Sequence, residues 1–565
     1  MSIQVKTDDY PFNLGKYSRK ISTTSADAQR WFDRGLNWCF SYNHNEAVHC
    51  FKKASEFDSE CAIIHWGIAY AGGPNYNLPW DFFSADQLTA TLSDCLDALE
   101  KADKLKKTAS RFEQELIEAL FKRYQSRDVV PLEKLYAWAG AYAEEMAFLY
   151  ERHPDDFEAI CLYAESLMNK SPWKLWDPVT GQPVAAANPI RIKEVLEHGI
   201  KIGRASGVIH PGIWHLYIHT MEMSPIPEVA LRVGDELRDL VPDAGHLSHM
   251  PTHIDVQCGN YLDVVKSNHA GIEKDRKFFD YAGAKNFYSL YRSHNFHFKL
   301  YGAMFLGQYQ PAIEAAIEIQ ATVGDEVITR EENGVDPWFK AFIEPYMSLK
   351  THAFIRFGKW QEAIEDPLPE DQDLYKMTTA MKWYGRAIGY ANLKQDTEAR
   401  KAQRKFIELA DALPESCMLH VVPCSLILAV GREMLAGEIE YHAGNYERGF
   451  DHLREAVQLE DALPYDEPWP WMMPCRHALG ALLLDQGCAE EAAACYEADL
   501  GMNDEVIRAN RHPNNVWALL GLHDAYKQLG RIEDARKIKP QLDFALARAD
   551  RSVKASCYCS KKAAA

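Results

Sequence analysis

The chain has 565 residues and a formal net charge of −19. This length exceeds the roughly 250–300 residues at which a single hydrophobic core stops growing, so we expect several domains or one elongated array of repeats. Hydrophobic residues make up 47% and charged residues 25%, which is typical of a folded globular protein and excludes a disordered chain. Because the charge is acidic and no long run of Lys or Arg occurs, we expect no nucleic-acid partner.

The two ends of the chain give further expectations. The N-terminus has no apolar stretch typical of a signal peptide, and no uninterrupted apolar run of about 18 residues occurs anywhere. We therefore expect a soluble, cytoplasmic protein with no membrane partner. The 13 cysteines follow no framework spacing and fit reduced thiols. Cys557 and Cys559 are the exception, since they lie in a Lys- and Ala-rich end, and their role stays open.

The N-terminal part follows the tetratricopeptide pattern, with matching residues at Trp31, Gly35, Ala47, Phe51 and Ala54. Apolar positions there and further along the chain follow i, i+3, i+4 spacing, and period-two alternation is not sustained. We predict an all-α fold, a tetratricopeptide-like α-solenoid of helical hairpins. Its expected sections are an N-terminal arm (1–25), N-terminal repeats (26–160), His-rich central repeats (161–310), C-terminal repeats (311–545) and a flexible tail (546–565).

Three features ahead of the central histidines are candidates for function. The Gly- and Asn-rich stretch around Asn75 is a candidate substrate loop, although ordinary repeat packing also explains its neighbourhood. Glu165 has apolar flanks, and a buried carboxylate must be paired or ligated, so it is a candidate base or a member of a salt bridge. Residues 169–183 have the Pro, Gly and aromatic content of an ordered loop, and we expect Trp173 and Trp176 to cover the histidines and contact substrate.

Nine of the 21 histidines fall within residues 210–297, far more than an even spread would give. The proline after His210 suits the first turn of a helix, which places His210 at the cap and His215, His219 and Glu222 on one face. Side chains at i and i+4 stand about 5–6 Å apart at Cβ, so two such imidazoles can chelate one ion. Glu222 is a candidate ligand, base or orienting partner.

A second group of histidines surrounds Pro251, which marks another helix start. We expect His246 and His249 in the connection before that helix and His253 in its first turn. Because the first helices of successive solenoid repeats line one concave surface, these imidazoles can meet those of the preceding group.

A third group, His294 and His297, lies on a later helix, where Tyr291 is a candidate substrate contact. A single helical histidine is usually a core or surface residue, but packed apolar neighbours imply that these rings need partners. The predicted metal ligands are therefore His210, His215, His219, Glu222, His246, His249, His253, His294 and His297.

The second half of the chain carries a series of glycines, each followed by a polar and an aromatic residue: Gly259-Asn-Tyr261, Gly307-Gln-Tyr309, Gly358-Lys-Trp360 and Gly444-Asn-Tyr446, continued by Gly487 and Gly530. Most neighbouring glycines of the series lie 43 to 51 residues apart. Each separates two amphipathic helical stretches. We interpret each as the turn of a helical hairpin, with the glycine in the left-handed conformation.

The histidine motifs resemble those of a family of tetratricopeptide-like proteins found in bacteria and fungi. The matching runs are His210-Pro-Gly-x-x-His215-x-x-Ile-His219-x-x-Glu222 and Gly245-His246-Leu-x-His249-Met-Pro-x-His253-Ile. Further likeness spans nearly the whole chain, at Trp66-Gly67, Gly73-Pro-Asn75, Tyr163-Ala-Glu165, Tyr291-x-x-His294-Asn-x-His297 and Tyr465-x-Glu467-Pro468. Cys258 stands where the family pattern suggests Arg. Most members carry a generic repeat label, so the resemblance implies the fold rather than an activity.

So many histidines exceed the four ligands of a structural zinc site. Imidazole-rich ligation suits Cu, Fe, Zn or Ni: two groups of three histidines fit a dicopper centre, and two histidines with Glu222 fit non-haem iron. Our main hypothesis is a metal-dependent oxidoreductase with one or two ions, most readily Cu or Fe, that activates oxygen on a small organic substrate.

Two alternatives stay open. A zinc-type hydrolase or lyase would use Glu222 or Glu165 as general base. A non-catalytic tetratricopeptide scaffold would bind a protein partner in its groove, with the histidines structural. The solenoid surface also allows self-association.

Overall fold

The computed structural model describes residues 10–329 and 337–561. The N-terminal section contains α1 (Ala26–Phe40), α2 (His44–Phe57), α3 (Ala62–Ala71), α4 (Ala85–Leu105), α5 (Arg111–Leu120), α6 (Leu132–Arg152) and α7 (Phe157–Met168). The central section contains α8 (Pro189–Ser206), α9 (Pro211–Met221), α10 (Leu231–Leu237), α11 (Gly245–His249), α12 (Thr252–Gln257), α13 (Tyr261–Ala282) and α14 (Ser289–Leu306).

The C-terminal section continues in the same way, with α15 (Tyr309–Thr322), α16 (Asp325–Ile328), α17 (Pro337–Ile343), α18 (Leu349–Arg356), α19 (Trp360–Glu365), α20 (Lys376–Asn392), α21 (Asp396–Asp411), α22 (Cys424–His442), α23 (Tyr446–Asp461), α24 (Cys475–Asp485), α25 (Ala489–Asp499), α26 (Val516–Gln528) and α27 (Ile532–Arg548). The strands in the described residues are β1 (Met418–Leu419) and β2 (Val422–Pro423), a small antiparallel hairpin. No described helix combines the length and apolarity needed to cross a bilayer.

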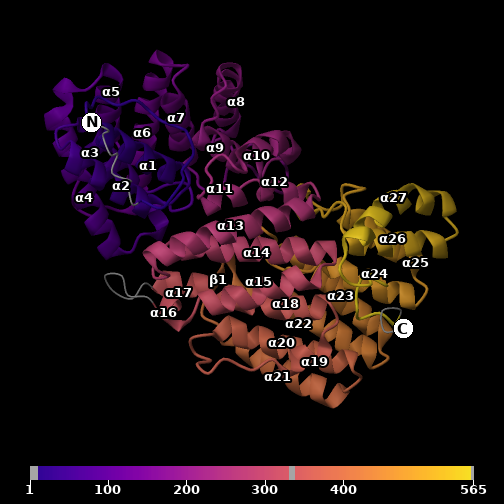
Figure 1. Cartoon of the computed structure of the whole chain (residues 1–565). Coiled ribbons are helices and arrows are strands. Elements are labelled where there is room, and N and C mark those ends of the chain that lie inside the picture. Colours follow the sequence, from indigo (N-terminus) through magenta and orange to yellow (C-terminus); the bar gives the residue numbers. More distant parts are fainter. Residues whose placement is uncertain (1–9, 330–336, 562–565) are drawn as a thin grey trace, which may run out of the picture.

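Consecutive helices pack as hairpins, among them α1 with α2, α20 with α21 and α22 with α23. Figure 1 shows these hairpins stacked into a curved array that runs from the indigo N-terminal helices through the magenta centre to the yellow C-terminal ones. The chain is therefore an all-α, tetratricopeptide-like solenoid, as the sequence predicts.

The glycine series ends helices as expected. Gly307 follows α14 with φ of +72°, and Gly444 follows α22 with φ of +92°. The other glycines of the series also have positive φ, at Gly259, Gly358, Gly487 and Gly530. Because this left-handed conformation is favourable for glycine alone, each one closes a helix and starts the return of its hairpin.

The C-terminal section folds back onto the centre of the chain. The Trp517 indole donates a hydrogen bond to the Met304 carbonyl at 2.7 Å, and the Arg508 guanidinium donates one to the Gln257 carbonyl at 3.0 Å. The buried apolar residues form two large clusters, one drawn from residues 12–291 and the other from residues 261–559. The central helices α11 to α14 thus lie where the two cores meet.

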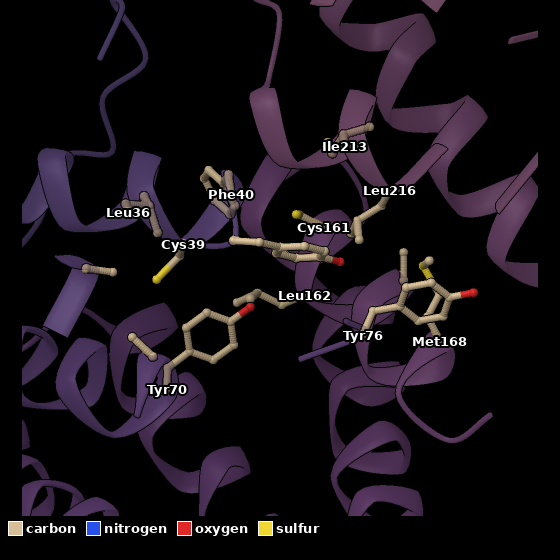
Figure 2. Close-up of a cluster of buried hydrophobic side chains, with 14 of the residues drawn as sticks. Leu36, Cys39, Phe40, Tyr70, Tyr76, Cys161, Leu162, Met168, Ile213 and Leu216 are labelled. Carbon is tan, nitrogen blue, oxygen red and sulfur yellow. The ribbon is translucent and has the colours of Figure 1, made fainter. Parts of the chain in front are cut away.

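The cluster of buried residues drawn from 12–291 packs against α9. Figure 2 shows Leu36 and Phe40 of α1, Cys161 of α7 and Ile213 of α9 directed into one buried cluster. Cβ atoms added at Gly212 of α9 would lie 2.6 Å from atoms of Phe40 and Cys161. Such close packing fixes the position of α9, which carries the first group of histidines.

The end of the chain is packed rather than free. Residues 546–565 were expected to form a flexible tail, but Val553, Ala555 and Cys559 are buried, and the Ser560 hydroxyl donates a hydrogen bond to Asp485 at 2.9 Å. Cys557 and Cys559 are joined in a disulfide, and the other described cysteines are free thiols. Apolar side chains at these positions give this short segment its own contacts with the solenoid.

Candidate metal centre

His210 caps helix α9 as the sequence predicts. Its Nδ1 accepts a hydrogen bond from the backbone N–H of Ile213 at 3.1 Å, and Pro211 begins the helix. The proton of the neutral ring is therefore on Nε2, which lies 3.7 Å from Oε1 of Glu158. Nε2 of His210 has no hydrogen-bond partner among the described residues, but His210 is in none of the groups of candidate metal ligands found there.

The first group of imidazoles is His215, His219 and His246, which are all buried and whose ring nitrogens lie within 4.8 Å of one another. His215 and His219 are one turn apart on α9, with ring centroids 4.8 Å apart. His246 lies on the one-turn helix α11 rather than in an irregular connection, and its Nε2 is 3.2 Å from Nε2 of His215. We call these three residues the first triad.

The second group is His249, His253 and His294, again buried and within 4.8 Å at their ligand atoms. His249 ends α11, and His253 lies in the first turn of α12, after Pro251 interrupts the backbone hydrogen-bond ladder. His294 comes from α14, and its ring centroid is 4.7 Å from that of His249. These three residues form the second triad.

The two triads are neighbours. The rings of His246 and His249 lie 5.9 Å apart, and those of His219 and His253 lie 6.0 Å apart. Two carboxylates border this junction: Glu222 at the end of α9 and Glu467, which together with His253 form a third group of close ligand atoms. Six imidazoles and two carboxylates therefore share one buried volume.

Fixed partners hold the outer nitrogen of four imidazoles. Nδ1 of His215 donates to the Phe40 carbonyl at 2.7 Å, and Nδ1 of His219 donates to Glu222 at 2.8 Å. Nδ1 of His249 donates to Oδ1 of Asn268 at 2.7 Å. Nδ1 of His253 donates to Oε2 of Glu467 at 2.6 Å and lies 2.8 Å from Oε2 of Glu222. A neutral imidazole carries one N–H, so a neutral ring held at Nδ1 in this way directs the lone pair of Nε2 toward the other rings.

The Nε2 atoms converge. Those of His249 and His253 lie 2.8 Å apart and those of His215 and His246 lie 3.2 Å apart, so one ring of each pair can donate to the other, whereas Nε2 of His219 is buried without a partner among the described residues. Burial, together with neighbouring rings that repel a second positive charge, lowers the pKa of His219, His246 and His249 well below the usual range. Neutral imidazoles with converging nitrogens are suitable ligands, so the residues fit a metal ion.

Burial also disfavours the charged forms of Glu222 and Glu467. Burial and the nearby charge of Glu467 raise the pKa of Glu222 well above its usual value. Burial raises the pKa of Glu467 to about 7, against the effect of hydrogen bonding from Tyr465. One proton shared between the two carboxyl groups relieves their repulsion, as in other close carboxyl pairs.

A small cavity of about 50 Å³ lies beside the second triad. His246, His253 and His294 form one wall, and Tyr291 and Trp173 are among the aromatic residues that form the rest. The Trp173 ring lies edge-on to that of His219 at 5.8 Å. The loop of residues 169–183 therefore covers the histidines, as the sequence suggests.

Other predicted residues lie outside the triads. The Trp176 indole donates to the Thr220 carbonyl at 2.7 Å and so fixes the loop to α9. The Asn75 side chain accepts hydrogen bonds from the backbone of its own loop, at Asn77 and Leu78. Nε2 of His297 lies 2.9 Å from the Met472 sulfur, and although its ring centroid is 6.5 Å from that of His294, His297 is in no group of candidate ligands among the described residues.

Glu165 belongs to a different buried cluster. Tyr70 donates a hydrogen bond to its carboxylate, and Arg123 is the nearby positive charge. Burial raises the pKa of Glu165, while Arg123 opposes this shift. Among the described residues, Glu165 is in no group of candidate ligands, and its contacts are those of a paired structural carboxylate.

Two residues at the site were not among the predicted site residues, although Glu467 belongs to a run, Tyr465-x-Glu467-Pro468, that carries the family likeness. Glu467 reaches His253 from a segment 214 residues away, and His420 reaches His294 from the turn between β1 and β2, with ring centroids 5.1 Å apart. Nδ1 of His420 is hydrogen-bonded to Asp466. Burial opposes protonation of His420, but the charge of Asp466 outweighs it and raises the pKa of this imidazole. Glu467 and His420 reach the site only because the C-terminal section folds back onto the centre of the chain.

Comparison with known proteins yields only a distant likeness. No protein-family model matches the chain, and no curated protein matches it. The human IFIT1 dimer with m7Gppp-AAAA is 12% identical over 87% of this chain and 90% of that chain, with a TM-score of 0.31. Yeast Tom70 is 10% identical over 91% of this chain and 99% of that chain, with a TM-score of 0.30. At this level of similarity, the site has to be interpreted from the residues of this chain alone.

Proposed function

We propose that this protein is a metal-dependent enzyme, an oxidoreductase that acts on a small organic substrate with one or two transition-metal ions held by the two triads. The observation that carries the proposal is the convergence of imidazole Nε2 atoms in rings whose Nδ1 atoms are fixed by Phe40, Glu222, Asn268 and Glu467. Metal-binding histidines typically have such a fixed acceptor on the other ring nitrogen.

The donor set favours particular metals. Two neighbouring groups of three imidazoles match the preference of Cu, with Fe next, whereas Mg and Ca prefer oxygen ligands. Bound there, Cu or Fe would supply one-electron chemistry toward oxygen, which imidazole and carboxylate side chains do not provide. We also propose that the chain belongs to the bacterial and fungal group whose histidine motifs it resembles.

The protein's own groups have definite tasks in this proposal. The hydrogen bonds at Nδ1 orient His215, His219, His249 and His253, so that little reorganisation is needed when an ion binds. Trp173 and the other aromatic residues of the cavity exclude bulk water from the second triad. Glu222 and Glu467 hold a proton beside His253.

A zinc-dependent hydrolase or lyase is the second candidate, and one observation favours it. Glu222, His253 and Glu467 form a mixed group of two carboxylates and one imidazole, which suits zinc as well as iron. In that case Glu467, with its pKa of about 7, is the residue suited to act as general base.

Metal content and activity measured together test the proposal. The protein is purified without chelators, analysed for Cu, Fe and Zn, then stripped and reloaded with each metal while oxygen consumption and ester hydrolysis are followed. We expect Cu or Fe in the purified protein, with oxygen consumption restored by that metal and lost in His219→Ala and His253→Ala. Zinc with restored hydrolysis would favour the second candidate.

A third outcome would favour the hypothesis of a non-catalytic scaffold. Solenoids of helical hairpins commonly bind partners on a concave surface, and that role needs no buried imidazoles. If no metal is bound after purification and reloading, and both histidine variants keep the wild-type stability, the histidines are structural and partner binding is the better account.

A further inference from the structure

We infer that the cavity beside the second triad binds an uncharged aromatic compound with one hydroxyl group, that is, a ligand of the phenol class; as a statement about substrate, this rests on the function proposed above. The cavity contacts His246, His253 and His294 directly, so a ligand within it lies against the imidazoles. The cavity has a volume of about 50 Å³, below the range of about 300–1,000 Å³ usual for small-molecule sites, so its ligand must be small.

The walls of the cavity are flat and aromatic. Six rings contribute to them, from Phe82, Trp173, Phe287, Tyr291, Phe342 and Tyr346. They come from five separate segments of the chain, because the loop before α4, the loop after α7, α14 with the turn before it, α17 and the segment before α18 all meet here. Aromatic rings pack favourably against other rings by stacking or edge contacts, which gives a planar aromatic ligand an advantage over a saturated one.

The cavity offers no partner for an ionic ligand. Among the described residues, no Asp, Glu, Lys or Arg lines it. The His420 imidazole lines the cavity, but its Nδ1 is already paired with the Asp466 carboxylate. An ionised carboxylate, phosphate or amine would lose its hydration here without gaining an opposite charge, so ionic substrates are disfavoured.

Polar atoms of the lining fit a single hydroxyl group. Oδ1 of Asn77 is enclosed without a hydrogen-bond partner among the described residues, and the Tyr291 hydroxyl lies beside the Asn77 side chain. Since Asp466 holds Nδ1 of His420, Nε2 is the nitrogen of that ring free to meet a ligand hydroxyl. Such few polar groups in an apolar cavity orient a ligand rather than provide most of its affinity.

A second cavity gives this one a route to solvent. A larger cleft of about 370 Å³ runs beside α2 and α4, with lining residues that include Asn45, Gln87 and Asp94. Phe82 and Phe287 line both the cleft and the inner cavity, so they stand at the boundary between the two. An uncharged aromatic compound would pass from the polar cleft to the inner cavity between these two rings.

Calorimetric titration of the purified full-length protein with three probes tests the inference. Phenol has both the ring and the hydroxyl, cyclohexanol lacks the aromatic ring, and benzoate adds a negative charge. We expect phenol to bind at least about ten times more tightly than either of the other two, because each lacks one property that the cavity selects. Equal affinities for the three probes, or no binding of phenol, would overturn the inference.

Cavity-filling variants locate the bound probe. Leu290 and Val421 line the cavity without being candidate ligands, so Leu290→Trp and Val421→Trp should each weaken phenol binding by about tenfold or more. Ile317→Trp on α15 is the matched control, because that side chain is 54% exposed and lies outside the cavity, and it should bind phenol normally. Unchanged phenol binding in both cavity variants would place the probe elsewhere and overturn the inference.

Metal analysis of the same preparations separates this inference from the proposed function. Selective phenol binding in a protein that holds no metal would support the cavity's specificity and refute the metal-dependent enzyme. Bound Cu or Fe without selectivity for phenol would support the metal-dependent enzyme and refute the cavity's specificity.

Discussion

Nδ1 of His253 lies 2.6 Å from Oε2 of Glu467, although 214 residues separate the two in the chain. This contact joins α12 to the segment after α23, so the C-terminal section completes the site of the central section. Tyr465 donates a further hydrogen bond to the same carboxylate. The orientation of His253 therefore depends on the solenoid folding back on itself.

Replacing the Glu467 carboxylate should weaken metal binding without removing a triad histidine. Glu467→Gln keeps the size of the side chain but loses the charge that stabilises a ligated His253, and loss of such a partner typically costs about 10- to 100-fold in metal affinity. Competition with a chromophoric chelator measures this change. Glu460→Gln is the control: Glu460 is also buried in this section, but it accepts a hydrogen bond from the Cys475 backbone, so metal affinity should stay at the wild-type value. Equal losses in both variants would indicate a general effect on folding.

Two histidines on α14 should respond differently to substitution. His294→Ala removes a member of the second triad, and we expect the bound metal to fall by one ion or by at least half. His297→Ala removes a ring that contacts Met472 instead, so metal content should persist while the melting temperature falls through loss of packing. Elemental analysis and thermal unfolding of the two variants check this. Metal loss in His297→Ala would show that this ring belongs to the centre.

His210 should behave as a helix cap. His210→Ala removes the acceptor for the Ile213 N–H at the start of α9, which should lower the free energy of unfolding by roughly 1 kcal/mol. Chemical denaturation measures the change, and metal content should remain near the wild-type value. A variant that loses its metal but keeps its stability would assign His210 to the metal centre.

The sequence predicts most of the architecture because its signals are local. Left-handed glycines such as Gly307 and the cap at His210 are determined by neighbouring residues, as are the facing positions of His215 and His219 on α9. The two triads also follow from their motifs once the helices pack. The motifs do not predict which histidines stay outside the triads. The place of His297, for example, depends on how α14 meets α24 and the loop before it.

Local sequence patterns do not predict partners that lie far apart in the chain. Glu467 and His420 reach the site only because the superhelix closes, and periodicity along the chain carries no information on that closure. The acceptor for His215 is the backbone carbonyl of Phe40, which any residue type would supply. The packed end of the chain, near Cys559, is another feature set by tertiary contacts rather than by composition.

Buried carboxyl groups away from the site should make stability depend on pH. Burial raises the pKa of Glu438 to about 7, although the Asn392 amide donates a hydrogen bond to it at 2.9 Å. Because the folded-state pKa lies above the unfolded value of 4.5, this group's contribution is fully present below pH 4.5 and is lost as pH rises through 7. Glu438 should therefore make the free energy of unfolding of the wild type decrease between pH 5 and pH 8.

Glu438→Gln tests this dependence, since glutamine cannot ionise. The variant should be more stable than the wild type by about 1–3 kcal/mol at pH 8 and should show little gain at pH 5. Glu398→Gln, at an exposed position on α21, is the control and should leave the pH profile unchanged. Parallel profiles for the wild type and Glu438→Gln would contradict the raised pKa. Urea denaturation at several pH values gives both profiles.

The most direct test of the metal centre is the number of ions per chain in the wild type, His215→Ala, His249→Ala and the double variant, measured by elemental mass spectrometry on protein of known concentration. The two triads predict two ions of Cu or Fe in the wild type, about one in each single variant and none in the double variant. His442→Ala on α22 serves as a half-buried histidine outside the site and should keep both ions. No metal in the wild type, or the same content in all the variants, would contradict a metal centre at the two triads.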